Sequence, residues 1–107
     1  MQHSLDLDLP ISKADTFMKR FKGLMFERKP YVNKGLHLTP CESIHMFFMR
    51  FPLDIVFLDK ENRIVDVRYN LQPWKIAIPN RKAFSTLELP TGTIEKYNLQ
   101  IGDKLVL

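Results

Sequence analysis

The stretch of sequence that decides the fold runs from residue 55 to residue 69 and reads IVFLDKENRIVDVRY. Its first four residues form a continuous apolar run, which is typical of a strand buried on both faces. The next four residues, Asp59 to Asn62, are polar and favour a turn, and residues 63–69 return with β-forming side chains. This pattern predicts a β-hairpin and indicates a mainly β protein.

Further strands are expected on both sides of this hairpin. Leu5, Leu7 and Leu9 alternate with polar residues, which is the period of a half-buried strand. Runs of β-forming residues bounded by turn-forming residues predict other strands over residues 36–38, 43–51, 83–89 and 104–107. Many short strands separated by turns favour an antiparallel β-sandwich or barrel.

One short N-terminal helix is expected over residues 13–22. Ser12 is a suitable N-cap, and Asp15 follows it in the first turn of the expected helix. Phe17 and Phe21 then recur at helical spacing, and Gly23 can adopt the left-handed conformation that ends a helix. Such a helix would pack across one end of the β structure.

The composition fits one globular domain spanning residues 1–107. The hydrophobic fraction is 45% and the charged fraction 26%, both ordinary for a folded domain. The lone Cys41 cannot form an intramolecular disulfide, which suits a reducing compartment. The first residues lack the features of a secretory signal, and no apolar run approaches the ~20 residues needed to span a bilayer. A cytoplasmic location without membrane association is therefore expected.

The net charge of +4 is concentrated near the N-terminus. Most of the basic residues between Lys13 and Lys34 are unmatched, since only Asp15 and Glu27 oppose them. A solvated helix face and loop is the preferred interpretation of this segment, and nucleic acid is not the expected partner. Interaction with nucleic acid or protein through residues 13–34 remains an alternative. The sequence does not indicate an oligomeric state.

Four segments in order carry a family resemblance. They are Arg20–Met25 (RFKGLM), Pro52–Asp59 (PLDIVFLD), Leu87–Gly92 (LELPTG) and Gly102–Asp103. With these segments the chain resembles domain-of-unknown-function family 192, also called uncharacterised protein family 127. The resemblance covers about the whole chain and implies a jelly-roll-like β-sandwich, but it implies no function. In a gapless register His45 stands where the common form of the family has Trp.

Several charged residues lie inside otherwise apolar or rigid stretches. They are Arg50, Asp54, Lys75 and Glu88, with His45 in a hydrophobic β-stretch of its own. Carboxylates in such settings are rarely buried without partners, so a structural ion-pair network is the preferred interpretation. The alternative interpretation is a pocket that binds an anion or performs acid–base chemistry.

The preferred function is that of a non-catalytic binding module for a small ligand, which could be anionic. The expected ligand-binding residues are Arg50, Trp74, Lys75 and His45, at the seam between residues 45–54 and the irregular connection over residues 70–80, with Glu88 beneath. Trp74 on its own is more readily interpreted as a core residue.

The rival function is an enzyme in which His45 carries the proton and Asp54 or Glu88 orients it, because an ordinary imidazole pKa suits neutral pH. The sequence leaves open whether the protein is an enzyme.

A metal site is not expected. Cys41, His45 and Met49 offer soft donors that suit copper(I). On one extended strand, however, same-face residues four positions apart are separated by about 14 Å, at roughly 3.4 Å per residue. Packing is therefore the preferred role of these side chains, and no cofactor is expected.

Overall fold

The computed structural model describes residues 4–16, 34–46 and 49–107. Its centre is a five-stranded sheet in the order β2-β3-β8-β5-β6. These strands are β2 (Ile11–Ala14), β3 (Gly35–Leu38), β5 (Leu53–Leu58), β6 (Ile64–Leu71) and β8 (Ser85–Leu89). Two small sheets pair β1 (Ser4–Leu5) with β9 (Lys104–Leu105) and β4 (Ile44–His45) with β7 (Ile76–Ala77). The short helix α2 (Thr93–Lys96) completes the described elements.

The predicted hairpin is confirmed as β5 and β6, which pair antiparallel with Leu58 opposite Ile64. Its turn is held by the Asp59 side chain, whose Oδ1 accepts hydrogen bonds from the backbone N–H groups of Glu61 and Arg63 at 2.8 and 2.9 Å. Asn62 takes the left-handed conformation (φ 63°), which asparagine tolerates better than most residues. Short-range turn chemistry thus fixes the register of the two strands.

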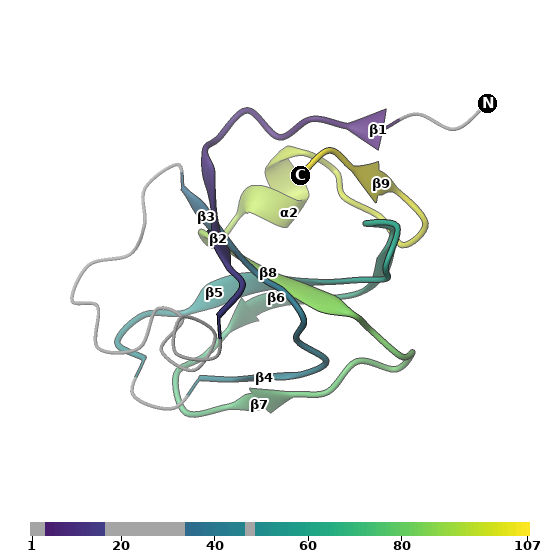
Figure 1. Ribbon diagram of the computed structural model, residues 1–107. Coiled ribbons are helices and arrows are strands. Elements are labelled where there is room, and N and C mark those ends of the chain that lie inside the picture. The colour runs from purple at the N-terminus through teal and green to yellow at the C-terminus, as the bar shows by residue number, and fades with distance from the viewer. Residues whose placement is uncertain (1–3, 17–33, 47–48) are drawn as a thin grey trace.

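The two faces of the central sheet bury separate cores. The α2 face bears Val56 and Leu87, and Figure 1 shows it beneath α2, β1 and β9. The β4–β7 face bears Ile55 and Phe57, and it is covered by β4 and β7. Because both faces are buried, β5 is apolar at every position except Asp54. All five residues of β8 are buried too, although Ser85, Thr86 and Glu88 are polar. The molecule therefore has three layers.

Two predictions about the fold need correction, and a third is not confirmed. The central sheet is open, ending at β2 and β6, so the barrel that the sequence offered as an alternative to a sandwich is wrong. The pairing is not wholly antiparallel, since β1 with β9 and β2 with β3 are parallel. The strand order does not establish the jelly-roll topology that the resemblance implies.

The predicted N-terminal helix is not confirmed. Lys13 and Ala14, its expected first residues, belong to β2, and residues 17–22 lie outside the described part of the chain. Ala14 is only 2% exposed. The backbone N–H and C=O groups of β2 find hydrogen-bond partners because this strand pairs with β3. Burial and sheet pairing therefore outweigh the local capping pattern at Ser12. Within the described residues, the helical turn α2 follows the left-handed Gly92.

Candidate functional site

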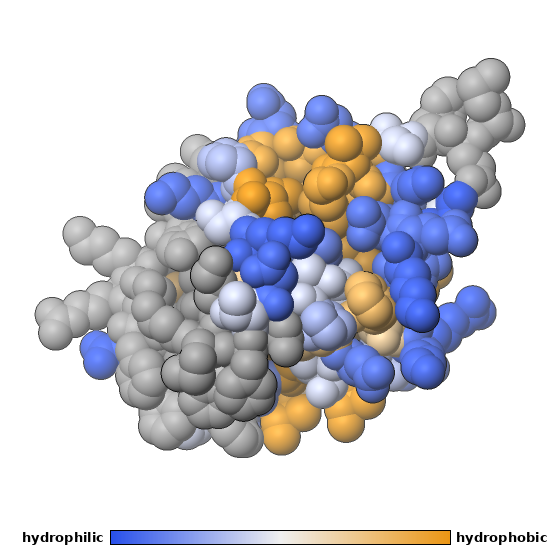
Figure 2. Space-filling model, viewed as in Figure 1, coloured by the Kyte–Doolittle hydropathy of each residue, from blue (hydrophilic) through white to orange (hydrophobic). Residues whose placement is uncertain are grey.

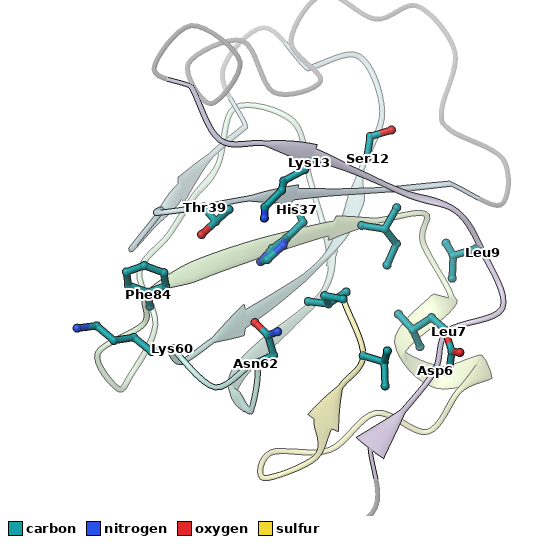
Figure 3. Close-up of a pocket in the computed structure, with 13 residues that line it drawn as sticks. Asp6, Leu7, Leu9, Ser12, Lys13, His37, Thr39, Lys60, Asn62 and Phe84 are labelled. Atoms are coloured by element: carbon teal, nitrogen blue, oxygen red, sulfur yellow. The ribbon is translucent and has the colours of Figure 1, made fainter.

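A pocket of about 440 Å³ opens on the α2 face (Figure 3). Its walls come from the chain between β1 and β2, from β3, from the β5–β6 turn and from the residues after β9. Its polar lining residues include Ser12, Lys13, His37, Thr39, Lys60 and Asn62. Its apolar lining residues include Leu7, Leu9, Ile11, Phe84, Val106 and Leu107. A volume of this size lies in the range of small-molecule sites.

Strand pairing places Lys13 beside His37. The two residues are register partners on the parallel strands β2 and β3, so their side chains share one face. His37 is in turn opposite Leu87 on β8, which is opposite Val56 on β5. This row of four residues lies on the α2 face. Leu87 and Val56 belong to the core of that face, and Lys13 and His37 line the pocket.

The His37 ring is held by a buried hydroxyl. His37 Nε2 lies 2.9 Å from Ser85 Oγ, and the two residues are 8% and 1% exposed. Burial lowers the pKa of His37, and the nearby Lys13 charge lowers it further. The imidazole is therefore neutral at pH 7. Ser85 is not among the residues that line the pocket, so its hydroxyl orients the ring rather than facing a bound molecule.

The opposite wall is built on the hairpin turn. Lys60 lies over the Phe84 ring, with Nζ 5.7 Å from the ring centroid. This cation–π contact holds a second ammonium group at the pocket. Asn62 adds an amide from the same turn, and its backbone carbonyl accepts a hydrogen bond from Leu105 of β9 at 2.9 Å. Lys13 and Lys60 thus bring two positive charges to one cavity from separate elements.

The residues predicted from sequence to bind a ligand come from the other side of the sheet. His45 pairs with Ile76, and the backbone N–H of Trp74 donates to the Met46 carbonyl at 2.7 Å. The backbone therefore does bring the segment around His45 against the connection that holds Trp74 and Lys75. Arg50 and Lys75 are exposed and His45 is half-buried. That these side chains form a ligand site stays a prediction.

Trp74 is not a core residue. It is 58% exposed, so the preferred interpretation from the sequence is wrong. Its backbone has a positive φ of 68°, a conformation uncommon for bulky residues, in a turn fixed against β4. Exposed apolar side chains also gather at the lower edge of the view in Figure 2, where Figure 1 places β7, whose neighbourhood exposes Ile76 and Ile78.

The two carboxylates proposed to orient His45 lie on opposite faces of the sheet. Asp54 lies on the α2 face, where its two oxygens accept hydrogen bonds from the backbone N–H groups of Asn70 and Ile94 at 2.9 and 3.0 Å. It therefore faces away from β4 and is not placed to orient His45. Glu88 pairs in register with Ile55 and so lies on the β4–β7 face.

Glu88 is buried in an apolar setting. It is 3% exposed, and burial raises its pKa to about 8. Within residues 4–16, 34–46 and 49–107, its Oε1 has no hydrogen-bond partner. The predicted ion-pair network of Arg50, Asp54, Lys75 and Glu88 is not what holds these two carboxyl groups, because Asp54 is capped by backbone and Glu88 is protonated at neutral pH.

The remaining sequence candidates are distributed as follows. Cys41 Sγ donates to the Ser43 carbonyl at 3.0 Å, and Met49 packs in the core of the β4–β7 face. Among the described residues, no group of three or more His, Cys, Asp or Glu side chains could hold a metal ion. Most of the basic segment, residues 17–33, lies outside the described part of the chain. No helix in that described part is long and apolar enough to cross a bilayer.

Sequence reasoning missed His37 because its strand is short and its partner is distant in sequence. The useful signal is a histidine between Leu36 and Leu38, since a polar residue in a strand buried on both faces needs a partner. The parallel pairing that adds Lys13 to the same face has no local signature.

Two proteins that are similar in sequence carry only an uncharacterised-family designation. A UPF0127 protein of Thermococcus sibiricus is 42% identical over 98 residues, which cover 86% of this chain and 62% of that protein. UPF0127 protein PF1050 of Pyrococcus furiosus is 36% identical over 105 residues, covering 94% of this chain and 88% of that protein.

Two crystal structures share the fold. One is a protein of unknown function from Novosphingobium aromaticivorans, and the other is described as a putative transcription regulator from Sinorhizobium meliloti. Each has a TM-score of 0.78 at 24% identity and covers 88% of this chain, which spans 71% and 78% of those chains respectively. At this identity the likeness establishes the fold alone. The model of the family DUF192, described as Uncharacterized ACR, matches residues 2–107, and the chain therefore belongs to this family of unknown function.

Proposed function

We propose that this protein is a non-catalytic binding module for a small anionic ligand. The ligand would bind in the pocket on the α2 face that Lys13, His37 and Lys60 line, here called the His37 pocket. The observation that carries the proposal is the placement of Lys13 and Lys60 on separate walls of one cavity. Ammonium groups from two elements favour an anion between them, and hydrogen bonds to charged groups are stronger than neutral ones. The hydroxyl group of Thr39 and the amide group of Asn62 supply further donors.

A binding role fits the pocket better than catalysis. The His37 ring could act as a base only through a nitrogen that reaches a ligand, and its Nε2 is engaged by Ser85. The Ser85 hydroxyl in turn is buried outside the pocket lining, so the pair lacks the accessible nucleophile of a hydrolase. The neutral imidazole of His37, held in place by Ser85, instead forms a polar part of the pocket lining.

The test compares two lysines that mark the two candidate sites. Isothermal titration with acetate, hexanoate and inorganic phosphate is performed on the wild type, Lys13→Gln and Lys75→Gln. Because Lys13 would contact the anion directly, we expect Lys13→Gln to weaken binding about tenfold, in line with a charged hydrogen bond. Lys75→Gln, which removes a charge that is also exposed and lies next to Trp74, should leave the affinity unchanged.

Two results would contradict this proposal. Loss of binding in Lys75→Gln with retention in Lys13→Gln would move the site to the seam between β4 and β7. Failure of all three anions to bind the wild type would remove the anion-binding function at this pocket.

A further inference from the structure

We infer that the ligand of the His37 pocket is an organic monoanion with an unbranched aliphatic chain, such as a medium-chain carboxylate; this rests on the proposed function. The observation behind it is that the pocket is amphipathic along its length. Figure 3 shows Lys13, His37, Thr39 and Lys60 toward one end, and Leu7 and Leu9 toward the other. An inorganic anion would occupy only the first end.

The change from cationic to apolar follows from alternation along the N-terminal chain. Leu7, Leu9, Ile11 and Lys13 are every second residue, and all four line the pocket. Ile11 and Lys13 lie on β2 and point to the same face, about 7 Å apart at two residues of strand rise. A carboxylate at Lys13 would therefore place its first methylene groups beside Ile11 and its chain against Leu9.

The apolar end has a second wall whose side chains are exposed to solvent. Val106 is 51% and Leu107 43% exposed, and both line the cavity with Leu7 and Leu9. An aliphatic chain between these walls would remove apolar surface from water on both sides. Each buried methylene is worth about 0.8 kcal/mol, so affinity should rise with chain length until the pocket is filled.

Asp6 limits the charge of the ligand. It lines the pocket, and Figure 3 places it beside Leu7, away from Lys13 and Lys60. A second carboxylate at the far end of the chain would meet this like charge and would also lose its hydration against leucine side chains. The pocket should therefore select a monocarboxylate over the dicarboxylate of equal length.

The experiment measures the dissociation constants of acetate, butyrate, hexanoate and adipate for the wild type, Asp6→Asn and Leu9→Ser. For the wild type we expect a gain of about two- to fourfold per methylene from acetate to hexanoate. Adipate should bind more weakly than hexanoate. Asp6 is exposed, so Asp6→Asn should not affect folding. This variant should reduce the preference for hexanoate over adipate by about two- to fivefold.

Leu9→Ser should flatten the dependence of the affinity on chain length, because it removes apolar surface that only the longer chains reach. If this variant is unstable, the Asp6→Asn comparison alone still decides the orientation of the chain. Equal affinities for acetate, butyrate and hexanoate would overturn this inference and leave anion binding intact. An unaltered preference for hexanoate over adipate in Asp6→Asn would overturn the placement of the chain end beside Asp6. Failure of all four carboxylates to bind the wild type would overturn this inference, and the proposed function would fail with it only if inorganic phosphate also did not bind.

Discussion

The two faces of the central sheet each bury a titratable side chain, and they treat it differently. On the α2 face, His37 has a hydroxyl partner and borders a cavity. On the β4–β7 face, Glu88 is sealed among apolar residues, and its Oε1 lacks a partner among the residues that the structure describes. Both groups are neutral at pH 7, since burial lowers the pKa of His37 and raises that of Glu88.

The difference indicates which face can bind a ligand. A buried polar group that borders a cavity can contact a molecule that enters the cavity. A group enclosed in a closely packed core cannot. Asp54 adds a third case, because it shares the α2 face with His37 but both of its oxygens are committed to backbone N–H groups. Burial of a charged residue type is therefore not enough to identify a site.

The largest effect is expected from Asp54 of β5, which holds α2 and the end of β6 against that strand. Asp54→Ala leaves two backbone N–H groups, those of Asn70 and Ile94, without acceptors, at a cost of about 1–3 kcal/mol each. We expect a loss of about 2–6 kcal/mol in the free energy of unfolding, measured by urea denaturation. Asp54→Asn keeps one acceptor and should lose less. A loss below about 1 kcal/mol in Asp54→Ala would show that these bonds do not hold the α2 face.

The next effect concerns the pH dependence of stability on the β4–β7 face. The folded-state pKa of Glu88, about 8, is above its ordinary value of 4.5, so the folded protein holds a proton that the unfolded chain releases. This contribution to stability is present below pH 4.5 and is lost as the pH rises through 8. Between these values the wild type should lose about 1.4 kcal/mol per pH unit from this group.

Glu88→Gln should abolish this slope, because the amide does not titrate. Denaturation between about pH 7 and 8 checks it, since this range lies above the ordinary pKa of histidine and below the pH at which the Glu88 slope ends. Glu95→Gln, at an exposed position on α2, serves as the control and should retain the wild-type slope. Equal slopes in the wild type and Glu88→Gln would mean that the Glu88 carboxyl finds a partner that keeps it charged.

The sequence predicts much of the fold because most of its signals are local. The β5–β6 hairpin follows from one apolar run, one turn and one return strand, and the structure confirms all three. The helix prediction is wrong at residues 13–14 for the opposite reason. There, parallel pairing with a strand about twenty residues away outweighs a local capping pattern. The hydrophobic pattern does not report such pairing.

The candidate site depends on the same non-local pairing. Lys13 and His37 become neighbours only through β2 and β3, and Ser85 reaches His37 only through β8. The charged residues that are conspicuous in the sequence, Asp54 and Glu88, prove to be a backbone cap and a sealed core group. A charged residue inside an apolar stretch of sequence thus indicates a buried side chain. Whether that side chain can bind a ligand depends on whether it borders a cavity.

The smallest effect compares two buried hydroxyls that are adjacent in sequence and face opposite ways. Ser85 Oγ is hydrogen-bonded to His37 on the α2 face, and Thr86 Oγ1 donates to the Cys41 carbonyl at 3.1 Å on the other face. Ser85→Ala and Thr86→Val should each cost about 1 kcal/mol of unfolding free energy, the value of one neutral hydrogen bond. Stability alone therefore does not separate the two positions.

The titration of His37, followed by NMR, does separate them. Its lowered pKa arises first from burial and then from Lys13, so Ser85→Ala should leave it low, whereas Lys13→Gln should move it toward 6.5. Because the folded-state pKa is below the unfolded one, the wild type should lose stability as the pH falls below about 6.5, and Lys13→Gln should lose less. Thr86→Val, acting on the opposite face, should leave the titration of His37 unchanged. A His37 that titrates at its ordinary value in the wild type would mean that the imidazole is solvated, and that the α2 face does not hold it as a neutral wall of the pocket.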